Sequence, residues 1–258
     1  MEKKTVVITG STRGIGYGLA VQFLKRGHQV VLNGRNPEVV AKKVHDLTSQ
    51  GYDARGIAGD VTEETTHQVL IALALESYKK IDIWINNAGI PQAYQYFEDL
   101  NSQQIRDLVS VNIAGLMLGT QAAVRFFKRQ GYGKIFNMEG FGSDGRMMDK
   151  LTLYGTTKRG VNYFTKSVSR EVKENSIQIG ILSPGMVRTD FLKNAMSAAE
   201  TEEQSKNKKV MDILAEDVET VTPFLVEQIL KSTKKYDRIE YLTKKRLIPK
   251  IVRLMMVK

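Results

Sequence analysis

Apolar residues along the chain occur in short runs, rich in β-branched and aromatic side chains, that alternate with longer segments of helical periodicity. Such runs are typical of strands buried in a parallel sheet, and they occupy residues 5–9, 29–32, 54–58, 81–85, 134–138 and 177–182. The segments that predict helices are 15–25, 37–49, 62–78, 102–130 (one or two helices), 153–174 and 220–231, before a last strand at 238–242. This alternation predicts an α/β fold with a doubly wound parallel sheet, formed by residues 1–258 as a single domain.

Residues 190–216 interrupt this alternation after the sixth strand, with a highly charged stretch that is compatible with helix. An insertion here would lie over the carboxyl ends of the strands, where ligands bind in such folds. We therefore expect a small substrate lid, with a disordered surface loop as the alternative. The apolar residues just before it and at its start favour a flat or apolar substrate; they are Met186, Phe191, Leu192 and Met196.

Composition narrows the functional classes. The 258 residues have an ordinary globular composition with no cysteine, which excludes disulfides, thiolate metal sites and a cysteine nucleophile. The three histidines are scattered without ligand spacing, so we expect no metal site. No secretory signal is visible and no apolar run approaches the length of a membrane-spanning helix, so we expect a cytoplasmic protein.

The net charge of +10 is concentrated in a basic C-terminal tail, residues 244–258, and in the stretch just before it. Ten basic and two acidic residues from Lys231 to Lys258 carry +8 of that charge, and apolar residues accompany them after the last strand. This pattern suits a helix packed on a neighbouring subunit of a homodimer or homotetramer, or on the chain itself. It also suits peripheral contact with an anionic membrane, or a frayed tail. No recognition motif predicts nucleic-acid binding.

A glycine-rich loop follows the first strand and opens the first helix, in the sequence Thr9-Gly-Ser-Thr-Arg-Gly-Ile-Gly16. Glycine permits a tight turn and lets backbone N–H groups approach a phosphate, which the helix N-terminus also attracts. In this strand–loop–helix context the loop predicts a dinucleotide site of the Rossmann type. The expected cofactor contacts are Gly10, Ser11, Thr12, Arg13, Gly14, Ile15 and Gly16.

Choice of cofactor depends on the residues after the second strand. An NAD enzyme places an acid there to bind the ribose hydroxyls, whereas this chain has Asn33-Gly-Arg35. Guanidinium groups of Arg35 and Arg13 would pair with a 2′-phosphate. We therefore expect NADP(H) rather than NAD, bound with Asn33 and Arg35 among its contacts.

A tyrosine and a lysine four residues apart, Tyr154 and Lys158, share one face of the predicted helix. A tyrosine can give or take a substrate proton, and a nearby ammonium favours its phenolate form and lowers its pKa. With the glycine spacing G-x-x-x-G-x-G and the sequence Asn86-Asn-Ala-Gly89, this pair resembles the short-chain dehydrogenase/reductase family over residues 4–195.

That resemblance implies further site residues. It assigns Tyr154, Lys158 and Asn112 to catalysis, with Asn112 holding the water of a proton relay. It also implies contacts of Tyr154 and Lys158 with the cofactor, and commonly a dimer or tetramer. The remaining cofactor contacts that it implies are Asp60, Val61, Asn87, Ala88, Gly89, Pro184, Gly185, Val187 and Thr189.

The chain departs from the family at one catalytic element. The family serine that polarises the substrate carbonyl follows the fifth strand, where this chain has Asn137-Met-Glu-Gly140. Ser143, close by in a glycine-rich stretch, is the candidate substitute, and the alternative is that Tyr154 acts alone. Residues 134–243 resemble the chlorophyll b reductase branch, whose plant members reduce a formyl group on a chlorin ring with NADPH.

We therefore expect an NADPH-dependent oxidoreductase that reduces the aldehyde or ketone of an apolar or flat small molecule by hydride transfer. Tyr154 would be the proton donor or acceptor. The alternative is a non-catalytic NADP-binding regulatory protein, which the missing serine favours and the intact Tyr154, Lys158 and Asn112 oppose.

Overall fold

A computed structural model describes residues 2–172, 176–190, 213–243 and 245–250 of the chain. Seven parallel strands form one sheet in the order β3-β2-β1-β4-β5-β6-β9. The strands are β1 (Thr5–Ile8), β2 (Gln29–Gly34), β3 (Ala54–Ala58), β4 (Ile83–Asn86), β5 (Gly133–Met138), β6 (Ile177–Ser183) and β9 (Tyr236–Glu240). The predicted doubly wound parallel sheet is thus confirmed.

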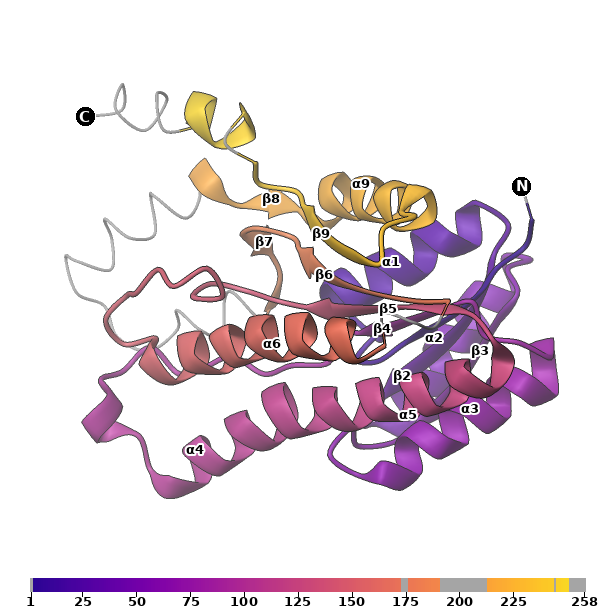
Figure 1. Cartoon of the computed structure of the whole chain (residues 1–258), viewed down its shortest axis with the longest axis horizontal. Coiled ribbons are helices and arrows are strands. Elements are labelled where there is room, and N and C mark those ends of the chain that lie inside the picture. The colour runs from indigo at the N-terminus through magenta and orange to yellow at the C-terminus, as the bar shows by residue number, and fades with distance from the viewer. Residues whose placement is uncertain (1, 173–175, 191–212, 244, 251–258) are drawn as a thin grey trace.

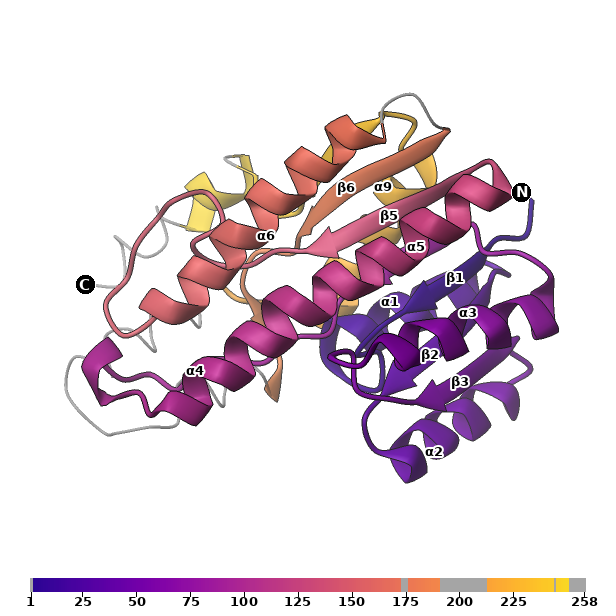
Figure 2. The ribbon, with the colours of Figure 1, turned by 60° about the horizontal axis from the view of Figure 1, so that its bottom comes forward.

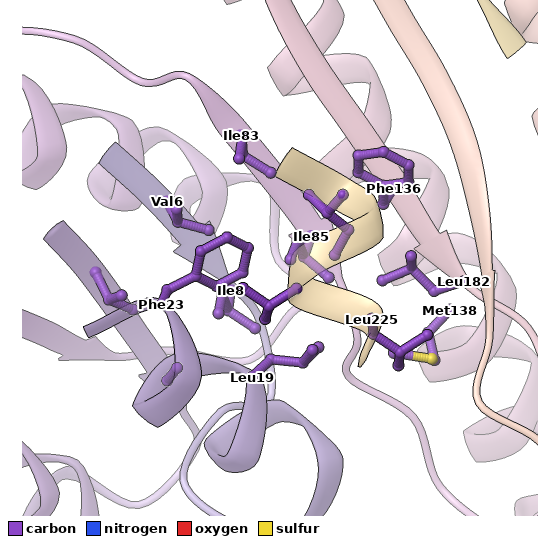
Figure 3. Packing of buried hydrophobic residues seen from close by; sticks show 14 of the residues in the cluster. Val6, Ile8, Leu19, Phe23, Ile83, Ile85, Phe136, Met138, Leu182 and Leu225 are labelled. Atoms are coloured by element: carbon purple, nitrogen blue, oxygen red, sulfur yellow. The ribbon is translucent and has the colours of Figure 1, made fainter. Parts of the chain in front are cut away.

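Helices cover both faces of this sheet, as Figures 1 and 2 show. They are α1 (Gly14–Lys25), α2 (Pro37–Thr48) and α9 (Val218–Lys231) on one face, and α3 (Glu64–Tyr78), α5 (Leu116–Gln130) and α6 (Thr152–Glu171) on the other. Successive strand residues serve opposite faces: Val6 and Ile8 pack with Phe23 of α1, whereas Val7 packs with Trp84. Figure 3 shows the first of these two cores. Burial on both faces explains why the strands are almost uniformly apolar.

The segment predicted as one or two helices is continuous from Ser102 to Gln130 and contains a π-helical turn. Helix α4 (Ser102–Val109) leads into η2 (Ser110–Gly115), and α5 follows without a break. By length and composition this segment could span a membrane, which differs from our expectation for the sequence. In the fold, α5 contacts α3, β4 and β5, and Phe127 is fully buried there.

A second, two-stranded sheet lies at the carboxyl edge, and the sequence pattern did not predict it. Strand β7 (Val187–Arg188) follows β6 directly and pairs in parallel with β8 (Glu216–Asp217), which precedes α9. The pair joins the two ends of the predicted lid. Most of that lid, residues 191–212, lies outside the described residues, as do residues 251–258 of the tail.

Candidate functional site

The glycine loop packs tightly against the end of β4. Gly10 has a φ of +60°, and a Cβ added there would lie 2.7 Å from the Cα of Ala88. A Cβ at Gly16 would overlap the side-chain amide of Asn87. Ser11 is fully buried and donates from its hydroxyl to the carbonyl of Ile8 over 2.7 Å. These positions therefore need small residues so that the loop can follow the sheet edge closely.

The N-terminus of α1 differs from that of α2 in its capping. Its N-cap residue, Arg13, makes no capping hydrogen bond with its side chain, and the first turn contains no acid. By contrast, the side chain of Asn36 caps α2 by accepting from the N–H of Val39. Uncapped N–H groups and the positive end of the helix dipole form an anion site, so this geometry fits a dinucleotide pyrophosphate.

Two cations flank this end of the loop. Arg13 lies at the start of α1 and Arg35 follows β2, the strand next to β1. Both residues are exposed, and neither forms an ion pair with a residue that the structure describes. Their guanidinium groups therefore remain available to an anionic ligand at this edge.

Three predicted cofactor contacts make hydrogen bonds inside the protein. Asn33 is buried and donates to the carbonyls of Ile57 and Gly59, at 3.4 and 3.1 Å. The Asn87 amide donates to both carbonyls at the start of the glycine loop, at 3.0 and 2.9 Å. Asp60 accepts from the backbone and hydroxyl of one threonine two residues later. The side chains of Asn33 and Asn87 thus shape the edge of the site.

The turn after β6 returns to the glycine loop. Gly185 has a φ of +74°, which lets the chain reverse after the buried Pro184. Val187 is buried, and Thr189 lies so that a Cβ on Gly14 would be 3.4 Å from its methyl group. The structure therefore brings this turn, which is predicted to contact the cofactor, next to the start of α1.

Tyr154 and Lys158 lie one turn apart on α6, as predicted. The Lys158 ammonium is 5.6 Å from the centre of the Tyr154 ring and donates to the carbonyl of Met138 over 3.2 Å. Gly140 faces the tyrosine from the end of β5, and a Cβ there would overlap the tyrosine hydroxyl. The pair is therefore enclosed between α6 and the end of β5.

Burial dominates the electrostatics of this pair. It raises the pKa of the Tyr154 hydroxyl, so the lowering that we expected from the neighbouring ammonium is wrong for this structure. Burial also lowers the pKa of Lys158 to about 8, against the opposing effect of the Glu139 carboxylate. Loss of hydration disfavours the charged form of each group, which moves the two pKa values in opposite directions.

Asn112 lies in the π-helical turn and is buried beside this pair. Its side chain accepts from the N–H of Ile90 at 2.9 Å and donates to the Ile90 carbonyl at 3.0 Å. A Cβ on Gly89 would lie 3.2 Å from the Asn112 oxygen and 3.8 Å from the Lys158 nitrogen. A π turn often marks a functional site, and this one places Asn112 next to Lys158.

Ser143 is buried on the turn that follows β5. Its N–H donates to the carbonyl of Gly140 over 3.2 Å, and its own carbonyl accepts from Arg159 of α6 over 3.0 Å. Gly142, with a φ of +89°, packs on the backbone of Gly155. The backbone of Ser143 is thus held against the start of α6, and its action as a carbonyl-polarising donor stays a prediction.

Gln92 is a residue of the site that the sequence analysis missed. Its side-chain oxygen accepts from the N–H of Tyr154 over 2.8 Å, and its nitrogen donates to the carbonyl of Lys150 over 2.9 Å. Gln92 is buried, so these bonds attach the first turn of α6 to the loop after β4. A lone glutamine in a loop carries no sequence signal for this role.

Glu139 is the second missed residue. One of its oxygens pairs with Arg238 of β9 at 2.7 Å, and the other accepts from Asn162 of α6 at 3.2 Å. The Glu139 side chain is only 1% exposed. An acid immediately after an apolar strand, in the stretch where the family carries its serine, was the signal available. Within the described part of the chain, no group of acids and histidines could hold a metal.

Known proteins resemble this chain throughout most of its length. A family model described as short chain dehydrogenase matches residues 4–200. A chloroplastic chlorophyll(ide) b reductase from Oryza sativa subsp. japonica is 40% identical over 232 residues, covering 87% of this chain and 66% of that relative. This chain thus spans just under two thirds of that relative's length.

Solved structures agree with the fold and with a nicotinamide cofactor. A 3-ketoacyl-(acyl-carrier-protein) reductase from Brucella melitensis, complexed with NADH, has a TM-score of 0.78 and 25% identity, covering 93% of this chain and 96% of that one. A gluconate 5-dehydrogenase from Burkholderia cenocepacia J2315, in complex with NADP and tartrate, has a TM-score of 0.78 and 26% identity, covering 93% of this chain and 94% of that one. The two complexes hold different cofactors.

Proposed function

This chain belongs to the short-chain dehydrogenase family of oxidoreductases, and on that premise we propose that it is an NADPH-dependent carbonyl reductase. The observation that carries the proposal is the grouping of Tyr154, Lys158 and Asn112 at the carboxyl edge of the sheet. The uncapped start of α1 lies at the same edge. A proton donor and an anion site thus occur on one side of the fold, as hydride transfer to a carbonyl requires.

Each residue of the site has its own role in the proposed reaction. Bound NADPH would supply the hydride. Tyr154, held protonated by its raised pKa, gives its proton to the carbonyl oxygen as negative charge develops there. Lys158 contributes a positive charge beside the tyrosine and a donor for a ribose hydroxyl. Asn112 holds the water of the relay that returns a proton to Tyr154. Ser143 is proposed as a second donor to the oxygen.

Arg13 and Arg35 support NADPH over NADH. Both are exposed at the edge where the adenosine end of the cofactor would lie, and the segment after β2 contains no acid that would repel a 2′-phosphate. We propose that their guanidinium groups pair with that phosphate. The remaining contacts would come from backbone N–H groups of the glycine loop.

For the substrate we propose an aldehyde or ketone on a flat, apolar small molecule. The chlorophyll(ide) b reductase relative supports a formyl group on a large ring system. Large apolar side chains also lie exposed on the loops joined by Gln92, and they suit such a surface; they are Tyr96, Phe97, Met147 and Met148.

The test is to mix purified protein with NADPH and a panel of aliphatic, aromatic and polycyclic aldehydes and ketones, and to follow absorbance at the nicotinamide band. We expect oxidation that requires a carbonyl, is faster with NADPH than with NADH, and favours apolar rings. Tight NADPH binding with no oxidation across the panel would instead support a non-catalytic regulatory protein.

A further inference from the structure

The described part of the C-terminal tail, residues 245–250, is helical and attached to the body of the protein. Arg246 lies over two aromatic rings, 4.3 Å from the centre of Phe224 in α9 and 4.1 Å from that of Tyr241. Its guanidinium also donates to the Tyr241 carbonyl over 3.1 Å. These contacts hold the segment against the end of β9 and the middle of α9.

Lys250 extends from this segment to the residues just before α9. Its ammonium pairs with Glu216 at 2.9 Å and donates to the carbonyls of Ile213 and Leu214 at 3.1 and 3.3 Å. An ammonium has three donors, and all three are thus used. The side chain is 19% exposed, so the contacts are partly shielded from water and from salt.

The same stretch before α9 pairs with the turn after β6. The N–H of Glu216 donates to the Met186 carbonyl over 2.9 Å, and Arg188 pairs with Asp217 at 3.0 Å. Thr189, the next residue, lies against Gly14 of the glycine loop. A continuous series of contacts therefore runs from Lys250 to the cofactor edge of the sheet.

A two-stranded pair this short has little stability of its own and depends on neighbouring contacts. Strands β7 and β8 contain only two residues each. The ion pair of Arg188 with Asp217 is largely exposed, and exposed pairs contribute little. The hydrogen bonds of Lys250 to the backbone just before β8 are better shielded from water than the pair of Arg188 with Asp217.

We infer that Lys250 and Arg246 are positioning residues, which hold β8, and through it β7 and Thr189, at the edge of the sheet where the cofactor is proposed to bind. The inference rests on the proposed function for the identity of the ligand, but the contacts themselves do not. The two basic side chains therefore act inside the chain, and a membrane or a second subunit would have to use the tail's other residues.

Hydrogen exchange in the full-length protein tests this arrangement without any ligand. In Lys250→Met, amides in peptides covering 186–189 and 213–217 should exchange at least about tenfold faster than in the wild type. Lys245→Met is the matched control, because Lys245 lies exposed in the same segment and the charge change is identical. If these amides exchange in Lys250→Met at the wild-type rate, the inference is overturned. Equal acceleration in Lys250→Met and Lys245→Met would also overturn it.

Fluorescence titration with NADPH provides the second measurement. Lys250→Met and Arg246→Leu should raise the dissociation constant severalfold, while Lys245→Met and the conservative Lys250→Arg remain near the wild type. If Lys250→Met does not fold, Glu216→Gln removes the same ion pair and should accelerate the same peptides. A wild-type protein that does not bind NADPH would contradict the proposed function, and the exchange rates would still decide whether Lys250 holds β8.

Discussion

Gly140 and Tyr154 lie so close together that a Cβ on the glycine would overlap the tyrosine hydroxyl. Gly140 ends the stretch Asn137-Met-Glu-Gly140, in which the family places the serine that polarises the carbonyl, so the absence of that serine affects packing as well as removing a donor. In this chain the tyrosine hydroxyl extends toward the space that the serine side chain would occupy. The same Cβ would also lie 3.4 Å from the Lys158 side chain.

Introducing a serine at this position with Gly140→Ser should therefore lower activity. The serine would displace the hydroxyl of Tyr154, and a misplacement of about 1 Å in an active site can cost on the order of 10²-fold in rate. We expect such a loss in kcat with NADPH. Gly155→Ala is the control, because the nearest contact of a Cβ there, among the residues that the structure describes, is at 3.8 Å. Equal or higher activity in Gly140→Ser would contradict this packing argument.

Burial of Lys158 and the nearby Glu139 carboxylate predict that activity depends on pH. The pKa of Lys158 is lowered to about 8 by burial, and the Glu139 carboxylate opposes that shift. Reduction should therefore fall as the pH rises through about 8, because Lys158 loses its proton. Glu139→Gln removes the negative charge that favours the ammonium, so the decline should move to lower pH.

The control for this pH effect is a second acid near the same groups. Tyr154 on α6 lies beside Lys158, and Arg238 on β9 pairs with Glu139. Arg238 also lies 3.9 Å from Glu240. Glu240→Gln removes an acid on β9 whose side chain is 41% exposed, so its profile should match the wild type. An unchanged profile in Glu139→Gln would separate Glu139 from the titration of Lys158.

Removing the proton donor should separate chemistry from binding. In Tyr154→Phe the ring remains and only the hydroxyl is lost, so we expect turnover to fall by about 10²- to 10⁴-fold. The dissociation constant for NADPH, measured by fluorescence, should change little. Substantial residual turnover would assign proton transfer to another group.

Ser143→Ala tests the proposed second donor. Loss of one hydrogen bond to a developing oxyanion costs roughly 10²- to 10³-fold in kcat. The backbone bonds of Ser143 do not depend on its side chain, so the fold should be retained. If kcat and melting temperature both match the wild type, the hydroxyl has no part in the reaction.

Cofactor preference should depend on the exposed arginines. Arg35→Asp replaces a cation with an anion at the predicted position of the 2′-phosphate, so NADPH should bind roughly tenfold or more weakly, and NADH should be affected less. The difference should shrink at high ionic strength. Arg129→Asp, at the far end of α5, makes the same charge change and serves as the control. Equal affinities for NADH and NADPH in the wild type would rule out this role.

Local patterns in the sequence determined most of the fold. Short apolar runs predicted six strands of the seven-stranded sheet, because parallel strands are buried on both faces and leave a signal in adjacent residues. The last strand was predicted at 238–242 and lies at Tyr236–Glu240. The glycine loop and the spacing of Tyr154 and Lys158 are also local: the loop follows β1, and the pair lies in the first two turns of α6. The short β7–β8 pair escaped prediction because two residues carry no periodicity.

Packing decided what remained. Glu139 and Arg238 are 99 residues apart, and they meet because β5, β6 and β9 are neighbours in the sheet. The pKa of Tyr154 rises because its surroundings exclude water, and the spacing from Lys158 alone pointed in the opposite direction. Likewise, the charge count of the tail could not show that Lys250 binds the backbone before β8. Desolvation and contacts distant in the chain are properties of the folded arrangement, so they arise only when the elements pack.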